Sequence, residues 1–400
     1  MEYLTLRSAF ENGRVVDWSI ENEIFQNLLG TEMKFNSDAI ASTHLILSQP
    51  LVTPQSLSKI TLQVLFETYG FPSVCLAPAP FLSCWGAVAD ICETNQVDST
   101  DTHTIQQHFP ECALVIDAGH ASVRVTPMYQ TLPVLEAEKV TRIGGRQLTN
   151  ILKEIVSYRY FDVSEEFFLM NDVKEKMLFF PTESNHTWNY NNPTQESIQM
   201  DPITENITIT TVLNTEFEIR ERRYAGKSVA EDRTKSLTLE FVLPDFKSTF
   251  TGYTRPSQGE GKEEQVLRLD VDRVIIPDFL FNPKNIGIAS GGVADAVLES
   301  LALLPVHLRP AFTNNIFLVG GTSNFAGFSE TLYNALRPNI PSQHPLRIFH
   351  TSDASRTCWN GGRVFVERQP RFSSSPWSIS RKEYDEMGDN IPSFPVCSLA

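Results

Sequence analysis

The sequence predicts an α/β fold with buried sheets, because glycine-bearing turns that follow apolar runs alternate along the chain with amphipathic helical patterns. Hydrophobic residues make up 41% of the chain and charged residues 20%, as in a folded globular protein. With 400 residues the chain is too long for one compact core, so two or three domains are expected. Three of the turns lie in VIDAGHASV (115–123), RIGGRQLTNIL (142–152) and FLVGGTSNFAGF (317–328).

The first hundred residues predict, in order, a helix, a strand and a helix. Residues 16–30 place apolar side chains on one helical face, and Gly30 follows as the expected C-cap. An apolar run at 43–50 predicts a buried strand. Residues 54–71 carry a second amphipathic pattern and predict the second helix.

Residues 112–129, CALVIDAGHASVRVTPMY, predict two strands joined by a tight turn. The first apolar run ends in Asp117-Ala118-Gly119, and an alternating run follows. Such a turn can surround a phosphate with backbone N–H groups while its carboxylate holds a metal-bound water. It can equally be an ordinary hairpin. The residues of the turn leave both interpretations open.

Beyond residue 140 the pattern continues as helices and strands with one interruption. A Gly-Gly turn enters a long helix at 140–161, and residues 164–180 continue as helix. Residues 181–236 are rich in Asn, Thr, Pro and Glu and have little periodicity, which predicts a partly disordered surface insertion. Later segments predict a helix at 292–305, a strand at 314–321 and a helix at 327–338.

The formal net charge of −15 limits the partners of the chain. Proteins that bind nucleic acid through its phosphates carry a basic face, and no Lys/Arg cluster supplies one. Strong direct nucleic-acid binding is therefore not expected, whereas basic protein partners are compatible with the charge. No apolar run is long enough to span a bilayer, so no membrane association is expected. The six cysteines lack a CxxC pair, which indicates neither a zinc site nor a disulfide framework.

The three glycine-bearing segments, in this order, resemble the actin family. Four more segments extend the resemblance over nearly the whole chain: LTLRSAFENGRVVDW (4–18), NDVKEKM (171–177), WNGGRVF (359–365) and WSISRKEYDEMG (377–388). Each motif is weak alone, but seven in the same order are specific. The resemblance implies an actin-like α/β fold with two lobes around a nucleotide cleft.

The resemblance also implies a division into subdomains. It assigns 1–108 and 356–400 to subdomain 1, 109–144 and 280–355 to subdomain 3, and 145–279, with the polar insertion 181–236, to subdomain 4. The chain opens where subdomain 1 of actin resumes. The first phosphate loop and nearly all of subdomain 2 are therefore expected to be missing, so that the first lobe is truncated.

Segments 144–159, 241–246 and 259–288 resemble a nuclear class of actin-related proteins. Members of that class are subunits of Swr-type chromatin-remodelling complexes, which exchange a core histone in the nucleosome for its Z variant. The resemblance implies a non-enzymatic structural subunit in the nucleus, with the cytoplasm not excluded. The implied partners are the Swr-type remodeller ATPase and a HIT-type zinc-finger subunit, with histones and the nucleosome reached through the complex.

The resemblance further implies a nucleotide site that is matched on its adenosine side. Asp117 and Gly119 correspond to the second phosphate loop of actin. The matched residues on the adenosine side are Gly145, Arg146, Lys174, Glu175, Gly320, Gly321, Thr322 and Phe325. ATP binding is expected to be weakened by the missing first phosphate loop.

The phosphate side of the site departs from the actin pattern. His120 and Ala121 stand where actin has an Asp and a Gly, and a Cβ at Ala121 would penalise a positive φ there. Ala79 and Arg124 stand where actin has the Gln and His that position the attacking water. Neither can act as a neutral general base, so hydrolysis is not expected. Ser355 replaces a basic residue near the adenine.

Ordinary structural interpretations stand beside these functional ones. Gly320-Gly321 can be a strand-to-helix turn that needs a positive φ, and Lys174 and Glu175 can be solvated helix charges. The aromatic side chains of Phe179, Phe180, Trp359 and Phe365 are expected in the core.

Other classes of protein also stay open at this point. An active nucleotide hydrolase of the actin, sugar-kinase and heat-shock-chaperone group would need two phosphate loops and a water-positioning pair. A cytoskeletal actin-like filament protein would need subdomain 2. Met1 can also be an internal codon of a truncated gene model, in which case ATP binding would be restored.

Overall fold

The computed structural model describes residues 7–11, 13–94, 109–181, 237–244, 251–256, 265–368, 377–387 and 395–399. The insertion predicted at 181–236 therefore lies outside the described residues, apart from its first residue. Within the described residues, no helix is both long and apolar enough to cross a membrane.

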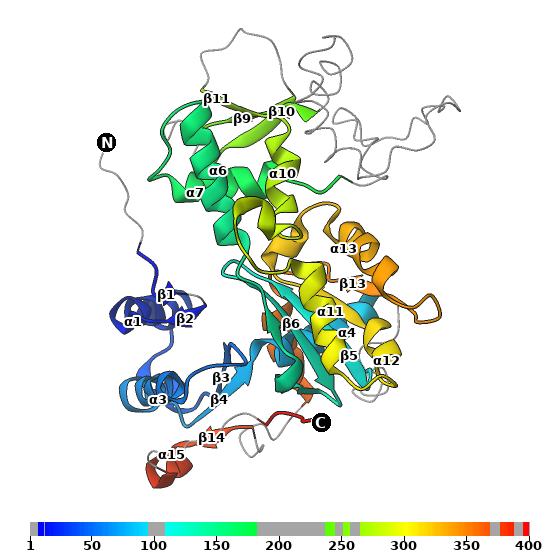
Figure 1. The fold of residues 1–400 in the computed structure, drawn as a ribbon. Coiled ribbons are helices and arrows are strands. Elements are labelled where there is room, and N and C mark those ends of the chain that lie inside the picture. The colour runs from blue at the N-terminus through cyan, green and yellow to red at the C-terminus, as the bar shows by residue number, and fades with distance from the viewer. Residues whose placement is uncertain are drawn as a thin grey trace, which may run out of the picture. The chain divides into compact units, whose positions relative to one another are not determined.

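The chain forms two compact units (Figure 1). Unit 1 comprises Met1–Thr141, Ala296–Ser323 and Asn339–Ala400, and unit 2 comprises Arg142–Asp295 and Asn324–Pro338. The finer division into subdomains stays a prediction.

Unit 1 is organised around a six-stranded sheet with the strand order β13-β12-β5-β6-β7, in which β8 also pairs with β6. Strand β12 runs parallel to both β5 and β13, while β6 is antiparallel to β5. The strands are β5 (Cys112–Ala118), β6 (Val123–Tyr129), β7 (Leu132–Pro133), β8 (Lys139–Val140), β12 (Ile316–Val319) and β13 (Ile348–His350). The predicted hairpin and the predicted strand at 314–321 are confirmed. Nearly all of β5 and β12 is buried, as expected of inner strands in an α/β sheet.

Helices α4 (Ala79–Thr94) and α14 (Thr357–Arg368) pack against each other and share a core cluster with β5 and β12. Their backbones approach so closely that two glycines are required at the crossing. A Cβ on Gly361 would lie 1.8 Å from the Leu82 carbonyl oxygen, and one on Gly86 would lie 2.1 Å from that of Thr357. The contact joins residues that are far apart in the sequence.

The N-terminal part of unit 1 contains a three-stranded sheet of β3 (Leu45–Gln49), β4 (Ser73–Pro78) and β14 (Ile379–Ser380), in the order β14-β4-β3. The strand predicted at 43–50 is confirmed as β3, but it is half-buried rather than buried because it lies at the edge of this sheet. The central strand β4 is fully buried.

Helix α1 (Trp18–Gln26) begins where the Asp17 side chain accepts hydrogen bonds from two backbone N–H groups, and it continues as a π-helical turn over Asn27–Glu32. The prediction that Gly30 ends this helix is wrong, because Gly30 lies inside the turn. Helix α3 (Gln55–Gln63) continues in the same way over Val64–Tyr69 and ends at Gly70, whose φ of 80° is left-handed.

The remaining elements of this unit are short or flank the sheets. They are β1 (Phe10–Glu11), β2 (Arg14–Val15), α2 (Ser37–Ala41), α12 (Arg309–Thr313), α15 (Arg381–Met387) and the 3₁₀ turns at Leu135–Ala137 and Gly321–Asn324. A further 3₁₀ turn, Arg337–Asn339, belongs mostly to unit 2. Helix α11 (Val293–Leu303) lies mostly in unit 1, where Ser300 donates a hydrogen bond of 2.7 Å to the Ala137 carbonyl.

Unit 2 combines helices with a second three-stranded sheet, in the order β10-β9-β11. Its elements are α6 (Gly145–Arg159), α7 (Phe167–Met177), β9 (Leu239–Val242), β10 (Tyr253–Pro256), β11 (Val266–Leu269), α10 (Asp272–Asp278), a 3₁₀ turn (Pro283–Ile286) and α13 (Phe328–Leu336). Glu240, on the central strand, is fully buried and accepts from Arg255 at 3.0 Å and Arg268 at 2.8 Å. One arginine from each neighbouring strand thus neutralises the carboxylate, which makes its burial tolerable.

The expected burial of the aromatic side chains is only partly confirmed. Phe180 and Phe365 are each 2% exposed, whereas Trp359 is 69% exposed. The prediction for Trp359 is wrong because Gly361 turns its own side of α14 toward α4. Trp359 lies two residues before Gly361, and at about 100° per residue its side chain is on the opposite side of the helix, away from α4.

Candidate functional site

In unit 1, the end of strand β5 and the turn after β12 bring five of the predicted site residues together: Asp117, Gly119, Gly320, Gly321 and Thr322. Val319 pairs with Asp117 in the parallel ladder, so Gly320 follows next to the Asp117 carboxylate. Gly320 has a φ of +91°, and a Cβ on it would lie 2.5 Å from both Asp117 Oδ1 and the Ala118 carbonyl oxygen. The predicted need for a positive φ in the glycine pair is therefore confirmed at Gly320. It does not extend to Gly321, where an added Cβ would make only an ordinary contact with Ser355 Cβ at 3.9 Å.

Two hydrogen bonds stabilise the turn between β5 and β6. Thr322 Oγ1 donates to the Gly119 carbonyl at 2.9 Å, and the Gly119 N–H donates to the Ser122 carbonyl at 3.2 Å. Neither Gly119 nor Ala121 has a positive φ. The expected penalty at Ala121 therefore does not arise, and the turn has the geometry of an ordinary hairpin that carries a carboxylate.

The Asp117 carboxylate faces a cation from its own sheet. Arg124 is its direct partner in the antiparallel pairing of β5 with β6. Burial raises the pKa of the Asp117 carboxyl, and the Arg124 charge opposes that rise. A carboxylate that would bind a metal-bound water in a phosphate loop is thus next to a guanidinium. The residues of unit 1 fit the magnesium-bound phosphates of a nucleotide poorly for this reason.

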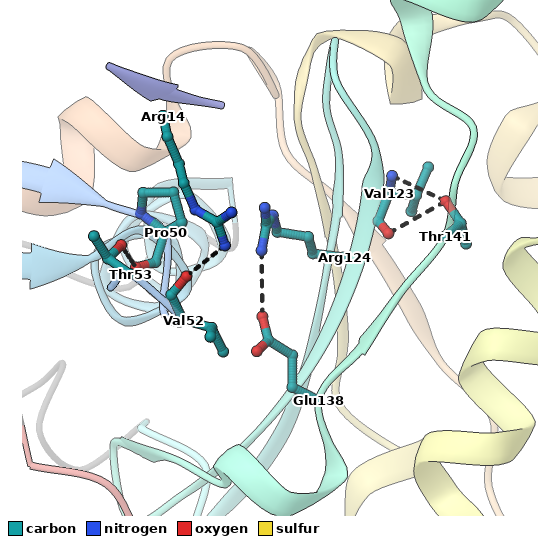
Figure 2. Close-up of polar contacts among 8 residues, drawn as sticks. All are labelled: Arg14, Pro50, Val52, Thr53, Val123, Arg124, Glu138 and Thr141. Carbon is teal, nitrogen blue, oxygen red and sulfur yellow. Dashed lines mark hydrogen bonds and ion pairs between the residues drawn. The ribbon is translucent and has the colours of Figure 1, made fainter. Parts of the chain in front are cut away.

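Arg124 is held between two carboxyl groups. Its Nη1 lies 3.7 Å from Oε1 of Glu138, a side chain that is 4% exposed (Figure 2). Burial raises the pKa of Glu138, while Arg124 and, more weakly, Arg14 lower it. The sequence offered no motif for Glu138 or Arg14. Their part in this cluster depends on contacts between distant segments.

Ala79, the other altered position, is the first residue of α4. Its carbonyl oxygen lies 3.8 Å from the Cys358 thiol, which donates to it. A methyl side chain can neither orient nor activate a water. At these two positions the described structure therefore has a methyl group and a guanidinium paired with carboxyl groups.

In unit 2, the first turn of α6 and the helix α7 bring Gly145 and Lys174 together. Lys174 Nζ donates to the Gly145 carbonyl at 3.3 Å and to Asn171 Oδ1 at 2.7 Å. The Asn171 amide in turn donates to Glu175 Oε1 at 2.7 Å. Asn171 thus links the two predicted residues of α7, a role that the sequence did not indicate.

Lys174 is not a solvated helix charge, because it lies on the buried face of α7 and is only 4% exposed. Burial lowers the pKa of its amine to about 8, and the neighbouring Glu175 opposes the shift. Glu175 itself is exposed, and so is Arg146 on the first turn of α6. These side chains remain accessible to a ligand, as the adenosine prediction requires, and that prediction is otherwise untested.

Phe325 is 6% exposed and belongs to an aromatic cluster of unit 2. Its ring centroid lies 6.3 Å from that of Phe180, which also packs edge-to-face on Phe281 and Phe328. Core packing therefore accounts for this side chain without a ligand.

Comparison with known proteins places these observations in a family. Residues 1–393 match the family described as Actin. The chain is 27% identical to "Actin-like protein arp6" of Aspergillus fumigatus, over 97% of this chain and 80% of that protein. It is 28% identical to "Actin-related protein 6" of Neurospora crassa, over 96% and 80% of the two chains. With "Actin-related protein 6" of Drosophila melanogaster the identity is 26%, over 95% and 83%.

These matches confirm the resemblance that the ordered motifs indicated and the actin-like α/β fold that it implied. They also confirm that the chain is similar to actin-related protein 6, the class whose resemblance lies in segments 144–159, 241–246 and 259–288. Since the match to the family covers nearly the whole chain, this protein belongs to the actin family.

Proposed function

We propose that the protein is a non-catalytic, structural subunit of a Swr-type chromatin-remodelling complex that exchanges a core histone for its Z variant. The observation that carries the proposal is the similarity to actin-related protein 6 over 95–97% of the chain in species as distant as fungi and an insect. The partners in this proposal are the Swr-type ATPase and a HIT-type zinc-finger subunit. The site of action is the nucleus.

The geometry of unit 1 supports the non-catalytic part of the proposal. The carboxylate of Asp117 is opposed by Arg124, and Ala79 offers no polar side chain to a water. A member of the actin fold that has lost these groups retains its surfaces, and surfaces are what an assembly subunit needs. The net charge of −15 favours basic protein partners over direct contact with DNA.

The experiment that tests the proposal is purification of the tagged chain from nuclear extract, followed by identification of its partners by mass spectrometry. The expected result is recovery of the remodeller ATPase and the zinc-finger subunit in one large assembly. Deletion of the insertion, residues 181–236, is expected to weaken this recovery while the purified chain keeps its circular dichroism. Elution of the chain as a monomer without remodeller subunits would contradict the proposal.

A further inference from the structure

Helix α1 and its π-helical extension, dark blue in Figure 1, carry two apolar stripes. Phe25 and Leu29, four residues apart, pack into a core cluster of unit 1. The second set, called here the exposed stripe, consists of Ile24, Leu28 and Met33, which are 49%, 46% and 48% exposed. Single exposed apolar side chains are normal on a protein surface, whereas three in one line form a contiguous patch, a feature of contact surfaces.

The backbone geometry makes the exposed stripe continuous. Ile24 and Leu28 are four residues apart, so their side chains are neighbours on one helix face. The Met33 N–H donates to the Leu28 carbonyl at 2.9 Å, across the five-residue spacing of a π-turn. Met33 therefore lies one turn beyond Leu28. At about 1.5 Å per residue the stripe is roughly 13 Å long, enough for two turns of a second helix.

The segment that carries the exposed stripe is acidic. Residues 17–33 contain no lysine or arginine and four carboxylates, which are Asp17, Glu21, Glu23 and Glu32. Glu23 and Glu32 are exposed, and neither forms an ion pair with another described residue. Exposed charges of one sign that lack a partner within the fold favour a binding partner of the opposite sign.

Glu21 lies at the boundary between the two stripes, three residues before Ile24 and four before Phe25. It is 7% exposed, and its Oε2 is buried without a hydrogen bond within the described part of the chain. Burial raises the pKa of this carboxyl. A buried acceptor without a donor is costly, and a Lys or Arg side chain placed against this boundary would supply the donor.

The exposed stripe suits a helix better than other occupants. The backbone groups of α1 are hydrogen-bonded within the helix, so its outer face offers only side chains. An added strand would leave its own backbone groups unpaired, whereas a second helix satisfies its own. Nucleic acids and anionic membranes are repelled by the carboxylates, and a second copy of this chain would bring like charges together.

We propose that the exposed stripe of α1 docks a basic amphipathic helix of a protein partner. Apolar side chains of that helix, repeating every three or four residues, cover Ile24, Leu28 and Met33. Lys and Arg side chains on its flanks pair with Glu23 and Glu32. The inference is independent of the remodelling complex proposed above, since it concerns the chemistry of one surface and not the protein that supplies the helix.

The test uses a synthetic peptide of roughly 18 residues, five helical turns, with leucine on one face and lysine on the others. It is titrated calorimetrically into the purified full chain at low salt, and saturable binding is expected. A second peptide has the same leucines but glutamate in place of every lysine. It should not bind, because like charges repel.

Leu28→Gln is expected to weaken binding of the lysine peptide roughly tenfold or more, because it removes the apolar side chain at the centre of the stripe. Leu303→Gln is the matched control. Leu303 is a 56% exposed leucine at the end of α11, in unit 1, and its substitution should leave binding unchanged. Circular dichroism establishes that each variant is folded, and Ile24→Gln carries the same expectation should Leu28→Gln not fold.

The charge variants test the basic character of the partner. Glu23→Gln/Glu32→Gln is expected to weaken binding about two- to tenfold at low salt, and the difference from the wild type should vanish at high salt. Glu299→Gln/Glu367→Gln changes the net charge equally at two other exposed positions of unit 1 and should have no effect.

Several results would overturn the proposal. They are absence of saturable binding of the lysine peptide to the wild type, equal binding of the glutamate peptide, equal effects of Leu28→Gln and Leu303→Gln, and equal effects of the two charge variants. Sedimentation of a wild-type dimer that Leu28→Gln dissociates would assign the stripe to a second copy instead. Binding to phosphatidylserine vesicles that Leu28→Gln abolishes would assign it to a membrane. Recovery of partners from nuclear extract tests the proposed function separately, so either proposal can fail alone.

Discussion

Arg124 lies directly opposite Asp117 in the β5–β6 hairpin, so a guanidinium and a carboxylate occupy the same face of one sheet. Arg124 thereby supplies, from within the chain, the positive charge that a bound metal ion would bring to the Asp117 carboxylate. This pairing of Asp117 with Arg124 should affect ATP hydrolysis at this site, which can be measured.

The purified chain is expected to hydrolyse ATP no faster than the buffer background. The reason is that Ala79 and Arg124 replace the water-positioning pair, a class of contact worth about 10²–10⁴-fold in rate. Phosphate release is the measurement, with Asp117→Ala as the control. Steady turnover in the wild type that disappears in Asp117→Ala would show that the site is catalytic.

Alanine substitutions at the two neighbouring glycines at the end of β12 are expected to change stability by very different amounts, because only Gly320 has a positive φ. Gly320→Ala must accommodate a φ of +91° and an overlap with the Ala118 carbonyl oxygen. We expect a loss of about 2 kcal/mol or more in the free energy of unfolding. Gly321→Ala has no neighbour closer than 3.9 Å and should change it by at most about 0.5 kcal/mol. Chemical denaturation of both variants measures the difference in the free energy of unfolding. Equal values for the two variants would contradict the positive φ and the close backbone contact at Gly320.

The crossing of α4 and α14 provides a second pair of adjacent glycines. Gly361→Ala places a methyl group 1.8 Å from the Leu82 carbonyl oxygen and forces the helices apart, at a cost of about 3 kcal/mol. Gly362→Ala meets nothing closer than 3.9 Å and should be neutral or, through helix propensity, more stable by up to about 1 kcal/mol. The two melting temperatures measure the difference. A Gly361→Ala variant as stable as Gly362→Ala would mean that the helices do not cross this closely.

The buried amine of Lys174 is expected to make stability depend on pH. Its pKa falls from the usual 10.5 to about 8 on folding, so between these values the unfolded chain binds more protons than the folded one. The free energy of unfolding should therefore rise with pH across this window, by at most about 1.4 kcal/mol per pH unit.

Lys174→Met lacks the titrating group and serves as the reference. The difference between wild type and Lys174→Met, measured by urea denaturation from pH 7.5 to 9.5, isolates the contribution of this amine from that of every group that the two chains share. The wild type should gain on the variant as the pH rises above 8. Parallel curves would contradict a buried amine.

Much of the fold could be predicted because its signals are local. The alternating run after Asp117 and the Gly-Gly turn before α6 each specify their own structure, and both appear where expected. Gly30 and Gly70 show where local reasoning stops, since both follow an amphipathic pattern and only Gly70 adopts the left-handed cap. The local sequence pattern therefore does not say which glycine ends a helix here.

The candidate site was less predictable because its electrostatics depend on distant contacts. Lys174 has the sequence context of a surface charge, and only the packing of α7 shows it to be buried. Similarly, nothing near Arg14 in the sequence indicates that its charge lowers the pKa of Glu138. Alignment with the family motifs identified the positions of the candidate site residues. It could not predict the protonation states of their side chains or the residues with which they pair.

The close contact of α4 with α14 also determines when unit 1 can be completed during synthesis. Ala79 and Cys358, which touch at this interface, are 279 residues apart. At about 5–20 residues per second, a ribosome needs roughly 15–55 s to make the chain between them. Throughout that interval the apolar face of α4 emerges without the helix that covers it. That face therefore stays uncovered by α14 until the last segments of the chain have been made.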